Sequence, residues 1–119
     1  MKLRVGFVGL GNIGRPMAAR LVAAGMHTTV YDVDASAVAA LVDLGAHAAI
    51  AARELAAAAD VTGVCVRDDE QLRAVVTGDD GLLAGASEGD MIAVHSTVLP
   101  DTVRELAVLA EQQGVLLID

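Results

Sequence analysis

Short apolar runs alternate along this chain with longer segments in which apolar residues recur at helical spacing. Short runs bounded by turn residues are typical of buried strands, whereas the longer segments are typical of amphipathic helices. Their alternation predicts an α/β fold: a doubly wound, mostly parallel, six-stranded Rossmann sheet with helices on both faces. The predicted strands cover residues 3–8, 28–31, 46–50 (the weakest), 61–66, 91–95 and 115–118.

Proline and glycine mark where the predicted helices begin and end. Pro16 lies in the first turn of the helix after the first strand, and Gly25 ends that helix. Gly45 and Gly114 are expected to end two others. The last helix begins at Pro100, and its apolar face repeats at i, i+3, i+4 and i+7, with Val103, Leu106, Ala107 and Ala110.

A glycine-rich turn, GLGNIG at residues 9–14, joins the first predicted strand to the first predicted helix. Gly9 allows a tight turn, Gly11 lets a pyrophosphate approach the backbone, and Gly14 lets the helix pack close to the strand. The helix then directs its free amides and the positive end of its dipole toward the anion. The turn therefore predicts a site for the phosphates of a dinucleotide.

Asp32 closes the second predicted strand, 18 residues beyond Gly14. A carboxylate at this place accepts hydrogen bonds from the adenosine ribose hydroxyls, and its charge repels the 2′-phosphate of NADP. The glycine turn and Asp32 together predict an NAD-binding βαβ unit, with NADP as the less favoured cofactor.

The composition bounds the size of the protein and its partners. A chain of 119 residues, 55% of them hydrophobic, fits one dinucleotide-binding domain over residues 1–119 and leaves no room for a second of ordinary size. The net charge of −8 disfavours nucleic acid and anionic membranes as partners. No apolar stretch reaches the roughly 20 residues of a membrane span. The single cysteine, Cys65, fits a reducing compartment, so we expect a cytoplasmic protein.

Ligands of open α/β sheets bind beyond the carboxyl ends of the strands, and four segments of this chain should meet there. We expect the first two to hold the pyrophosphate and the adenosine ribose, and the last two to flank the nicotinamide. The acidic run that follows the fourth strand has no histidine or cysteine at ligand spacing, so no metal site is expected. The four segments are residues 9–14, 32–33, 65–68 and 96–97.

Three stretches of the chain resemble the β-hydroxyacid dehydrogenases, a family that includes 3-hydroxyisobutyrate dehydrogenase and tartronate semialdehyde reductase. They are GFVGLGNIGRPMAARLVAAG at 6–25, VYDVD at 30–34 and HSTVLP at 95–100. The resemblance implies that Asn12 and Ile13 contact the pyrophosphate.

The same resemblance assigns roles to the segments that follow the fourth and fifth strands. It implies that Val66 and Arg67 cover the cofactor. It also implies that Ser96 and Thr97 line the reaction end, with Thr97 contacting the cofactor and both residues facing the substrate. From the sequence alone, Ser96 and Thr97 could instead cap the helix that starts at Pro100, because hydroxyl residues favour helix starts.

The chain departs from the family in three places, the first being Ile13, which stands where methionine is usual. Arg67 stands where a proline is common, and the sequence stops at Asp119, where family members continue into a glycine-rich substrate motif, a catalytic lysine and a helical domain. Its only lysine, Lys2, precedes the first strand. The resemblance therefore implies the NAD-binding part of an oxidoreductase that transfers hydride between NAD and a small hydroxy acid, without catalytic residues of its own. The face that meets the helical domain would be apolar, and the isolated chain would self-associate.

Two other functions stay open. A stand-alone NAD-binding or regulatory module would need no general base, and none is evident here. An imine reductase-like domain shares the opening motif but typically prefers NADP, which Asp32 disfavours. His95 is expected to be structural and Cys65 a buried strand thiol, whereas His27 and His47 belong to no pattern.

Overall fold

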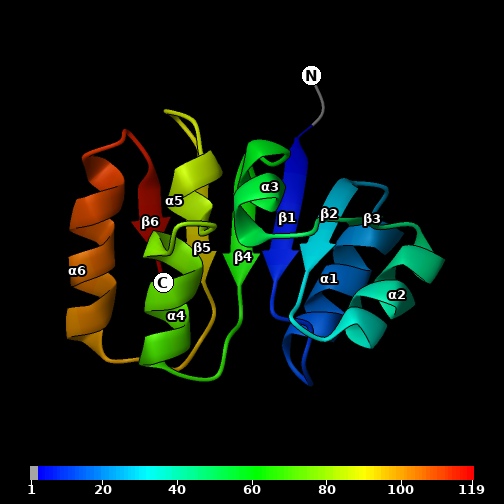
Figure 1. Ribbon diagram of the computed structural model, residues 1–119. Helices are drawn as coiled ribbons and strands as arrows, with labels where there is room; N and C mark the ends of the chain where they lie inside the picture. Colours follow the sequence, from blue (N-terminus) through cyan, green and yellow to red (C-terminus); the bar gives the residue numbers. More distant parts are fainter. Residues whose placement is uncertain (1–2) are drawn as a thin grey trace.

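The computed structural model contains a six-stranded parallel sheet in the order β3-β2-β1-β4-β5-β6, with helices on both faces (Figure 1). This order and the helical crossovers confirm the predicted doubly wound Rossmann fold. The elements are β1 (Arg4–Val8), α1 (Gly14–Ala23), β2 (His27–Tyr31), α2 (Ala35–Leu44), β3 (His47–Ala48), α3 (Ala52–Ala57), β4 (Val61–Val64), α4 (Asp69–Thr77), α5 (Leu82–Gly85), β5 (Met91–Val94), α6 (Pro100–Glu111) and β6 (Leu116–Ile118).

The structure describes residues 3–119, so Lys2 lies outside the described residues. No helix between residues 3 and 119 combines the length and the apolar character that crossing a membrane would require. The expected cytoplasmic location stays a prediction.

The predicted strands are all present, and they differ from the prediction mainly at their ends. β3 is only two residues long, in line with the weak pattern at 46–50. The predicted strands 61–66 and 91–95 end earlier, at Val64 and Val94. The residues that follow these two strands form loops at the carboxyl edge of the sheet, which is the lower edge in Figure 1.

Glycine and proline mark the helix ends as predicted. Gly25, Gly45 and Gly114 lie just beyond α1, α2 and α6, with φ angles of 81°, 117° and 73°. A side chain on Cβ disfavours this left-handed conformation, which explains glycine at helix ends. Pro16 lies in the first turn of α1, and Pro100 is the first residue of α6.

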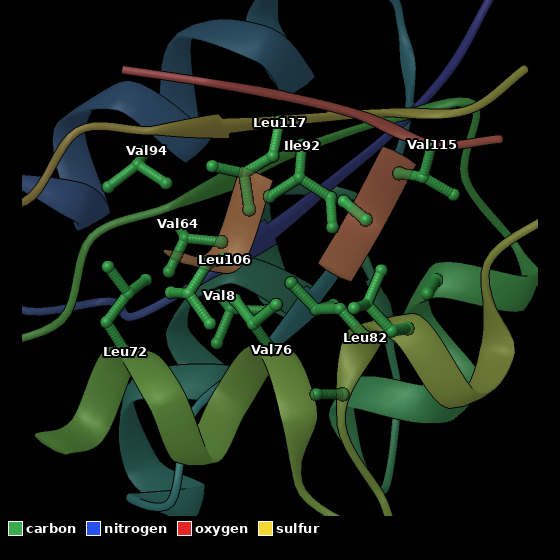
Figure 2. Close-up of a cluster of buried hydrophobic side chains, with 14 of the residues drawn as sticks. Val8, Val64, Leu72, Val76, Leu82, Ile92, Val94, Leu106, Val115 and Leu117 are labelled. Carbon is green, nitrogen blue, oxygen red and sulfur yellow. The ribbon is translucent and has the colours of Figure 1, made fainter. Parts of the chain in front are cut away.

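Two hydrophobic clusters fill the two faces of the sheet, because successive side chains of a strand point to opposite sides. Phe7 belongs to the cluster beneath α1 and α2, and its neighbour Val8 belongs to the larger cluster beneath α3, α4, α5 and α6. Figure 2 shows helix side chains of the larger cluster directed at the strands. Its fully buried leucines come from all four helices: Leu55, Leu72, Leu82 and Leu106.

The face of the sheet that carries α1 and α2 is covered only in part. In the outer strands, Met91 pairs with Leu116 and Ala93 with Ile118, and all four side chains point away from the larger cluster. Leu116 and Ile118 are 54% and 41% exposed. A groove of about 290 Å³ runs between this region and α1, lined mainly by apolar residues. We call Met91, Ala93, Leu116 and Ile118 the open sheet face. The self-association expected from the sequence stays a prediction.

His27 and His47 stack on each other, although the sequence linked them by no pattern. Their ring centroids are 4.4 Å apart and the rings are inclined by 17°. The pairing of β2 with β3 brings them together, because Thr29 lies opposite His47 and His27 is two residues away on the same side of its strand.

Candidate dinucleotide-binding site

Three of the four predicted segments line one hollow of about 500 Å³ at the carboxyl ends of β1, β2 and β4. A second hollow of about 330 Å³ lies between the glycine turn and the start of α2. Gly11 lines both. The larger hollow is lined by Val8, Gly9, Gly11, Tyr31, Asp32, Val33, Cys65, Val66, Arg67, Gln71, Ala74 and Val75. The smaller is lined by Leu10, Gly11, Asn12, Arg15, Pro16, Asp34, Ser36 and Ala37.

Gly9 and Gly14 are required by the fold itself. Gly9 has a φ of 93°, and a Cβ on it would overlap the carbonyl oxygen of Cys65 in the neighbouring loop. A Cβ on Gly14 would overlap the carbonyl oxygen of Gly9. The tight turn and the close helix approach predicted for these residues are therefore built into the strand, turn and helix.

Gly11 differs from its neighbours because nothing in the described structure requires a glycine there. A Cβ on Gly11 would meet no atom of residues 3–119 within 4 Å, and φ is not positive. Gly11 itself lines both hollows, beside the N-terminus of α1. Such a space fits a pyrophosphate that approaches the backbone, with the free amides of the helix directed at it.

The residues between the glycines are presented to solvent. Asn12 is exposed, and Ile13 is 67% exposed although its side chain is apolar. Ile13 is also the N-cap of α1, and the first turn of that helix carries no acidic side chain. Arg15 follows at the rim of the smaller hollow. This end of α1 is therefore suited to an anion, as the sequence predicted.

Asp32 braces the glycine turn, a role that the sequence did not reveal. Its Oδ2 accepts the backbone N–H of Leu10 at 2.7 Å, and its Oδ1 accepts the N–H of Asp34 at 2.8 Å. A carboxylate has about four lone-pair sites, so acceptor capacity is left for ribose hydroxyls. Asp32 lines the larger hollow, where the prediction places the adenosine ribose.

Asp34 brings a second carboxylate to the site, at the smaller hollow. It caps α2 by accepting the Ser36 N–H at 3.0 Å and the Ser36 hydroxyl at 2.7 Å. These hydrogen bonds hold the pKa of Asp34 below its usual value, the hydroxyl having the largest effect. Sequence reasoning overlooked Asp34, although a helix N-cap aspartate two residues after Asp32 is visible in VYDVD.

The loop after β4, which we call the cover loop (residues 65–68), is held by side chains from two directions. The Val66 N–H donates to Ser96 Oγ at 2.8 Å, and the Arg67 N–H donates to Gln71 Oε1 at 2.9 Å. Asp68 in turn caps α4 by accepting the Gln71 N–H at 2.8 Å. Gln71 thus restrains the loop at Arg67, where the β-hydroxyacid dehydrogenases commonly have a proline.

Ser96 and Thr97 follow β5, and the structure separates their positions. Ser96 is half-buried and its hydroxyl accepts the Val66 N–H, whereas Thr97 is exposed. Neither lines the larger hollow, and the hydrogen bond between Ser96 and Val66 links this fourth predicted segment to the cover loop, which does line it. Neither caps α6, whose N-cap is Leu99. The alternative that these hydroxyls cap the helix is therefore wrong.

The sequence predicts a buried strand thiol at Cys65, but this residue is only half-buried and lies in the cover loop, one residue beyond the end of β4. Burial raises the pKa of the Cys65 thiol, which disfavours the reactive thiolate. The ring of His95 lies over that of Phe7, with centroids 6.1 Å apart and an inclination of 14°. In the described part of the chain, no three side chains among histidine, cysteine, aspartate and glutamate are grouped so as to hold a metal ion.

A family model described as the NAD binding domain of 6-phosphogluconate dehydrogenase matches residues 4–119. The chain belongs to this family. The match includes the glycine turn, the hollows beside it and the cover loop. The chain is therefore an NAD-binding domain of the type found in 3-hydroxyisobutyrate dehydrogenase-like oxidoreductases, as its motifs indicated.

Known relatives match almost the whole chain. An uncharacterized oxidoreductase of Mycobacterium tuberculosis is 40% identical over 98% of this chain and 39% of its own length. The 3-hydroxyisobutyrate dehydrogenase of Pseudomonas aeruginosa is 36% identical over 97% of this chain and also 39% of its own length. The chain thus spans about two fifths of the length of the relatives it matches.

Solved structures have the same fold. The 3-hydroxyisobutyrate dehydrogenase of Salmonella typhimurium superposes with a TM-score of 0.90 and 31% identity, covering 98% of this chain and 40% of that one. A structure of Psf3 in complex with NADP⁺ and 2-OPP gives a TM-score of 0.89 and 33% identity, over 95% of this chain and 40% of that one. Proteins similar to this chain therefore include one that was solved with NADP⁺.

Proposed function

We propose that this chain presents NAD for hydride transfer to or from a small hydroxy acid, within a larger oxidoreductase. Residues 1–119 would form its dinucleotide-binding domain, and polypeptide outside these residues would supply the substrate site and the proton chemistry. The resemblance of GLGNIG, VYDVD and HSTVLP to the β-hydroxyacid dehydrogenases supports this, as does the similarity to a 3-hydroxyisobutyrate dehydrogenase. When bound, the nicotinamide supplies the hydride chemistry, and the domain orients it.

The observation that carries the proposal is the unfilled space at Gly11. The fold explains Gly9 and Gly14 without a ligand, but it does not explain Gly11. We propose that the pyrophosphate occupies this space, contacted by the backbone of the glycine turn and by Asn12 and Ile13.

The remaining site residues divide between the two ends of the cofactor. Asp32 would bind the adenosine ribose from the larger hollow, which it lines. Val66 and Arg67 would cover the cofactor from the cover loop, and Ser96 and Thr97 would face the reaction end. The arrangement of the strands supports this division, because β1 and β2 end on one side of the hollow and β4 ends on the other.

We further propose that the domain prefers NAD to NADP. Asp32 and Asp34 border the two hollows on the adenosine side, so a 2′-phosphate there would approach two carboxylates. The lowered pKa of Asp34 keeps that group charged at neutral pH. Arg15, in the first turn of α1, lines the smaller hollow together with Asp34, and Arg67 of the cover loop lines the larger one.

The open sheet face supports a further part of the proposal, the self-association of the isolated chain. Leu116 and Ile118 expose apolar surface beside Met91 and Ala93 on strands that no helix covers from that side. A second copy that packs against this face would remove it from water.

Calorimetric titration of the purified chain with NADH and NADPH tests the cofactor part of the proposal. We expect NADH to bind and NADPH to bind at least about tenfold more weakly, because its extra phosphate meets two carboxylates. Equal or tighter binding of NADPH would contradict the role given to Asp32 and would favour an imine reductase-like function. Failure of both nucleotides to bind would contradict the proposed site. Oxidation of small hydroxy acids with NAD by the whole protein would test the reaction itself.

A further inference from the structure

The loop after β5 (residues 95–99), which we call the reaction-end loop, is tied to α4 by the carboxylate of Asp69, a residue that lines neither hollow. Oδ2 of Asp69 accepts the backbone N–H of Leu99 at 3.0 Å. Leu99 is the N-cap of α6, and its own side chain cannot cap the helix. Asp69, on a different helix, therefore satisfies a backbone donor at the start of α6.

The same carboxylate is held by a network that extends along α4 and α6. The buried hydroxyl of Thr102 donates to Oδ2 of Asp69, and Arg73 Nη2 donates to the Thr102 oxygen at 3.2 Å. Arg73 Nε also bonds Glu105 at 2.9 Å. The bond from Thr102 is the main cause of the lowered pKa of Asp69, so the group is ionised at neutral pH. Asp69 is thus fixed in place rather than free in solvent.

The reaction-end loop is consequently restrained on both sides of Thr97. Ser96 bonds the Val66 amide of the cover loop, and Val98 packs against the larger hydrophobic cluster. Leu99 is bonded to Asp69. Thr97 is the exposed residue between these fixed points. Three restraints from different elements leave the Thr97 backbone little freedom, and the side chain stands at the carboxyl edge of the sheet.

We propose that Asp69 is a positioning residue of the cofactor site, because its bond to Leu99 sets the reaction-end loop and hence the place of Thr97. The inference rests on the proposed function, in which Thr97 contacts the nicotinamide end of the cofactor. Asp69 itself touches no part of the two hollows, and it acts through the backbone of the loop. A plain helix-dipole role in the first turn of α4 would not require its bonds to α6.

Titration with two nucleotides separates positioning from general stability. NADH carries the nicotinamide, whereas ADP-ribose lacks it but keeps the pyrophosphate and the adenosine. In Asp69→Ala the loop loses one of its restraints, so NADH should bind roughly tenfold more weakly while ADP-ribose binds as before. Asp69→Asn keeps an oxygen that accepts the Leu99 N–H and should recover most of the NADH affinity. Asp101→Ala is the control, because Asp101 lies in the first turn of α6 and pairs with the exposed Arg104.

The outcomes are distinguishable. An equal loss of NADH and ADP-ribose affinity in Asp69→Ala would mean that the variant damages the whole site, and it would overturn the positioning role. Unchanged NADH affinity would overturn it as well, as would a wild-type chain that binds both nucleotides equally. If the wild-type chain bound neither nucleotide, the proposed function itself would fail. Urea unfolding of each variant shows whether the fold persists under the titration conditions.

Discussion

The carboxylate of Asp32 accepts the backbone N–H of Leu10 at 2.7 Å, so the residue that ends β2 holds the turn that follows β1. The predicted selector of the ribose is thereby also part of the structure of the proposed phosphate site. Substitutions of Asp32 must remove the charge and the hydrogen bond separately if the two roles are to be distinguished.

Asp32→Asn and Asp32→Ala make this separation. The asparagine removes the negative charge and keeps an acceptor oxygen for the Leu10 N–H, so the preference for NADH over NADPH should fall by about tenfold with little loss of NADH affinity. The alanine also releases the glycine turn, so both nucleotides should bind more weakly. Calorimetric titration measures the affinity of each variant for NADH and for NADPH. An unchanged preference in Asp32→Asn would show that Asp32 does not select the cofactor.

Gly11→Ala should weaken NADH binding, whereas Gly9→Ala should lower the stability of the fold. The Cβ at residue 11 meets open space in the protein, so the stability of Gly11→Ala should change little. Its methyl group fills the proposed pyrophosphate space, so the free energy of NADH binding should become less favourable by about 1–3 kcal/mol. The Cβ at residue 9 meets the Cys65 carbonyl at a φ of 93°, so Gly9→Ala should destabilise the fold by at least ~2 kcal/mol. Urea unfolding and NADH titration of both variants give the comparison, and a Gly11→Ala variant with wild-type affinity would contradict the site.

The ion pair between Arg4 and Asp60 predicts a pH-dependent contribution to stability. The hydrogen bond from the Arg4 side chain, at 2.9 Å, lowers the pKa of Asp60 below its usual value. A lowered folded-state pKa adds stability above the unfolded pKa of about 3.9, and this contribution is lost as the pH falls through the folded value. Asp60→Asn should therefore reduce the free energy of unfolding at pH 7 and make no difference in strong acid.

Urea denaturation across this pH range measures the effect on the Arg4–Asp60 pair. The matched background is Arg4→Leu, in which Asp60→Asn should change the pH dependence less, because the cation is gone while the backbone N–H of residue 4 still bonds Asp60. A loss of stability that stays the same at all pH values would mean that the asparagine acts through something other than the charge of Asp60.

The open sheet face predicts concentration-dependent association of the isolated chain. Leu116→Lys and Ile118→Lys place charges on the exposed side of β6, and we expect each to shift the chain toward the monomer without loss of the fold. Val108→Lys, at a residue of α6 that is 56% exposed, is the control and should leave association unchanged. Sedimentation equilibrium over a wide concentration range is the measurement. A wild-type chain that remains monomeric throughout would rule out the proposed association.

Features encoded within one local segment could be predicted from the sequence. The glycine turn, Asp32 and the strand runs depend on neighbouring residues and on the rule that parallel strands end at one edge. Contacts between segments far apart in the chain could not be predicted in this way. The bond from Asp69 to Leu99 depends on where α4 and α6 lie, and the stack of His27 on His47 depends on the register of β2 with β3.

The predictions for the hydroxyl residues after β5 show the same limit. The sequence placed Ser96 either at the nicotinamide or at a helix cap, and the structure shows its hydroxyl on the Val66 amide. A serine hydroxyl can accept from any nearby donor, so composition and spacing do not choose among these partners. The choice follows from the loop conformation, which the neighbouring strand and helix determine.

Phe7 is the only phenylalanine of the chain, and its ring lies against Gly63, where a Cβ would be 2.6 Å from it. Gly63 is in the middle of β4 and has no side chain with which to shield its own strand. The ring from the neighbouring strand takes over that task, and it keeps water from the backbone hydrogen bonds between β1 and β4 on the side where helix cover ends. The aromatic ring of one strand thus shields the hydrogen bonds that join it to the adjacent strand at the centre of the sheet.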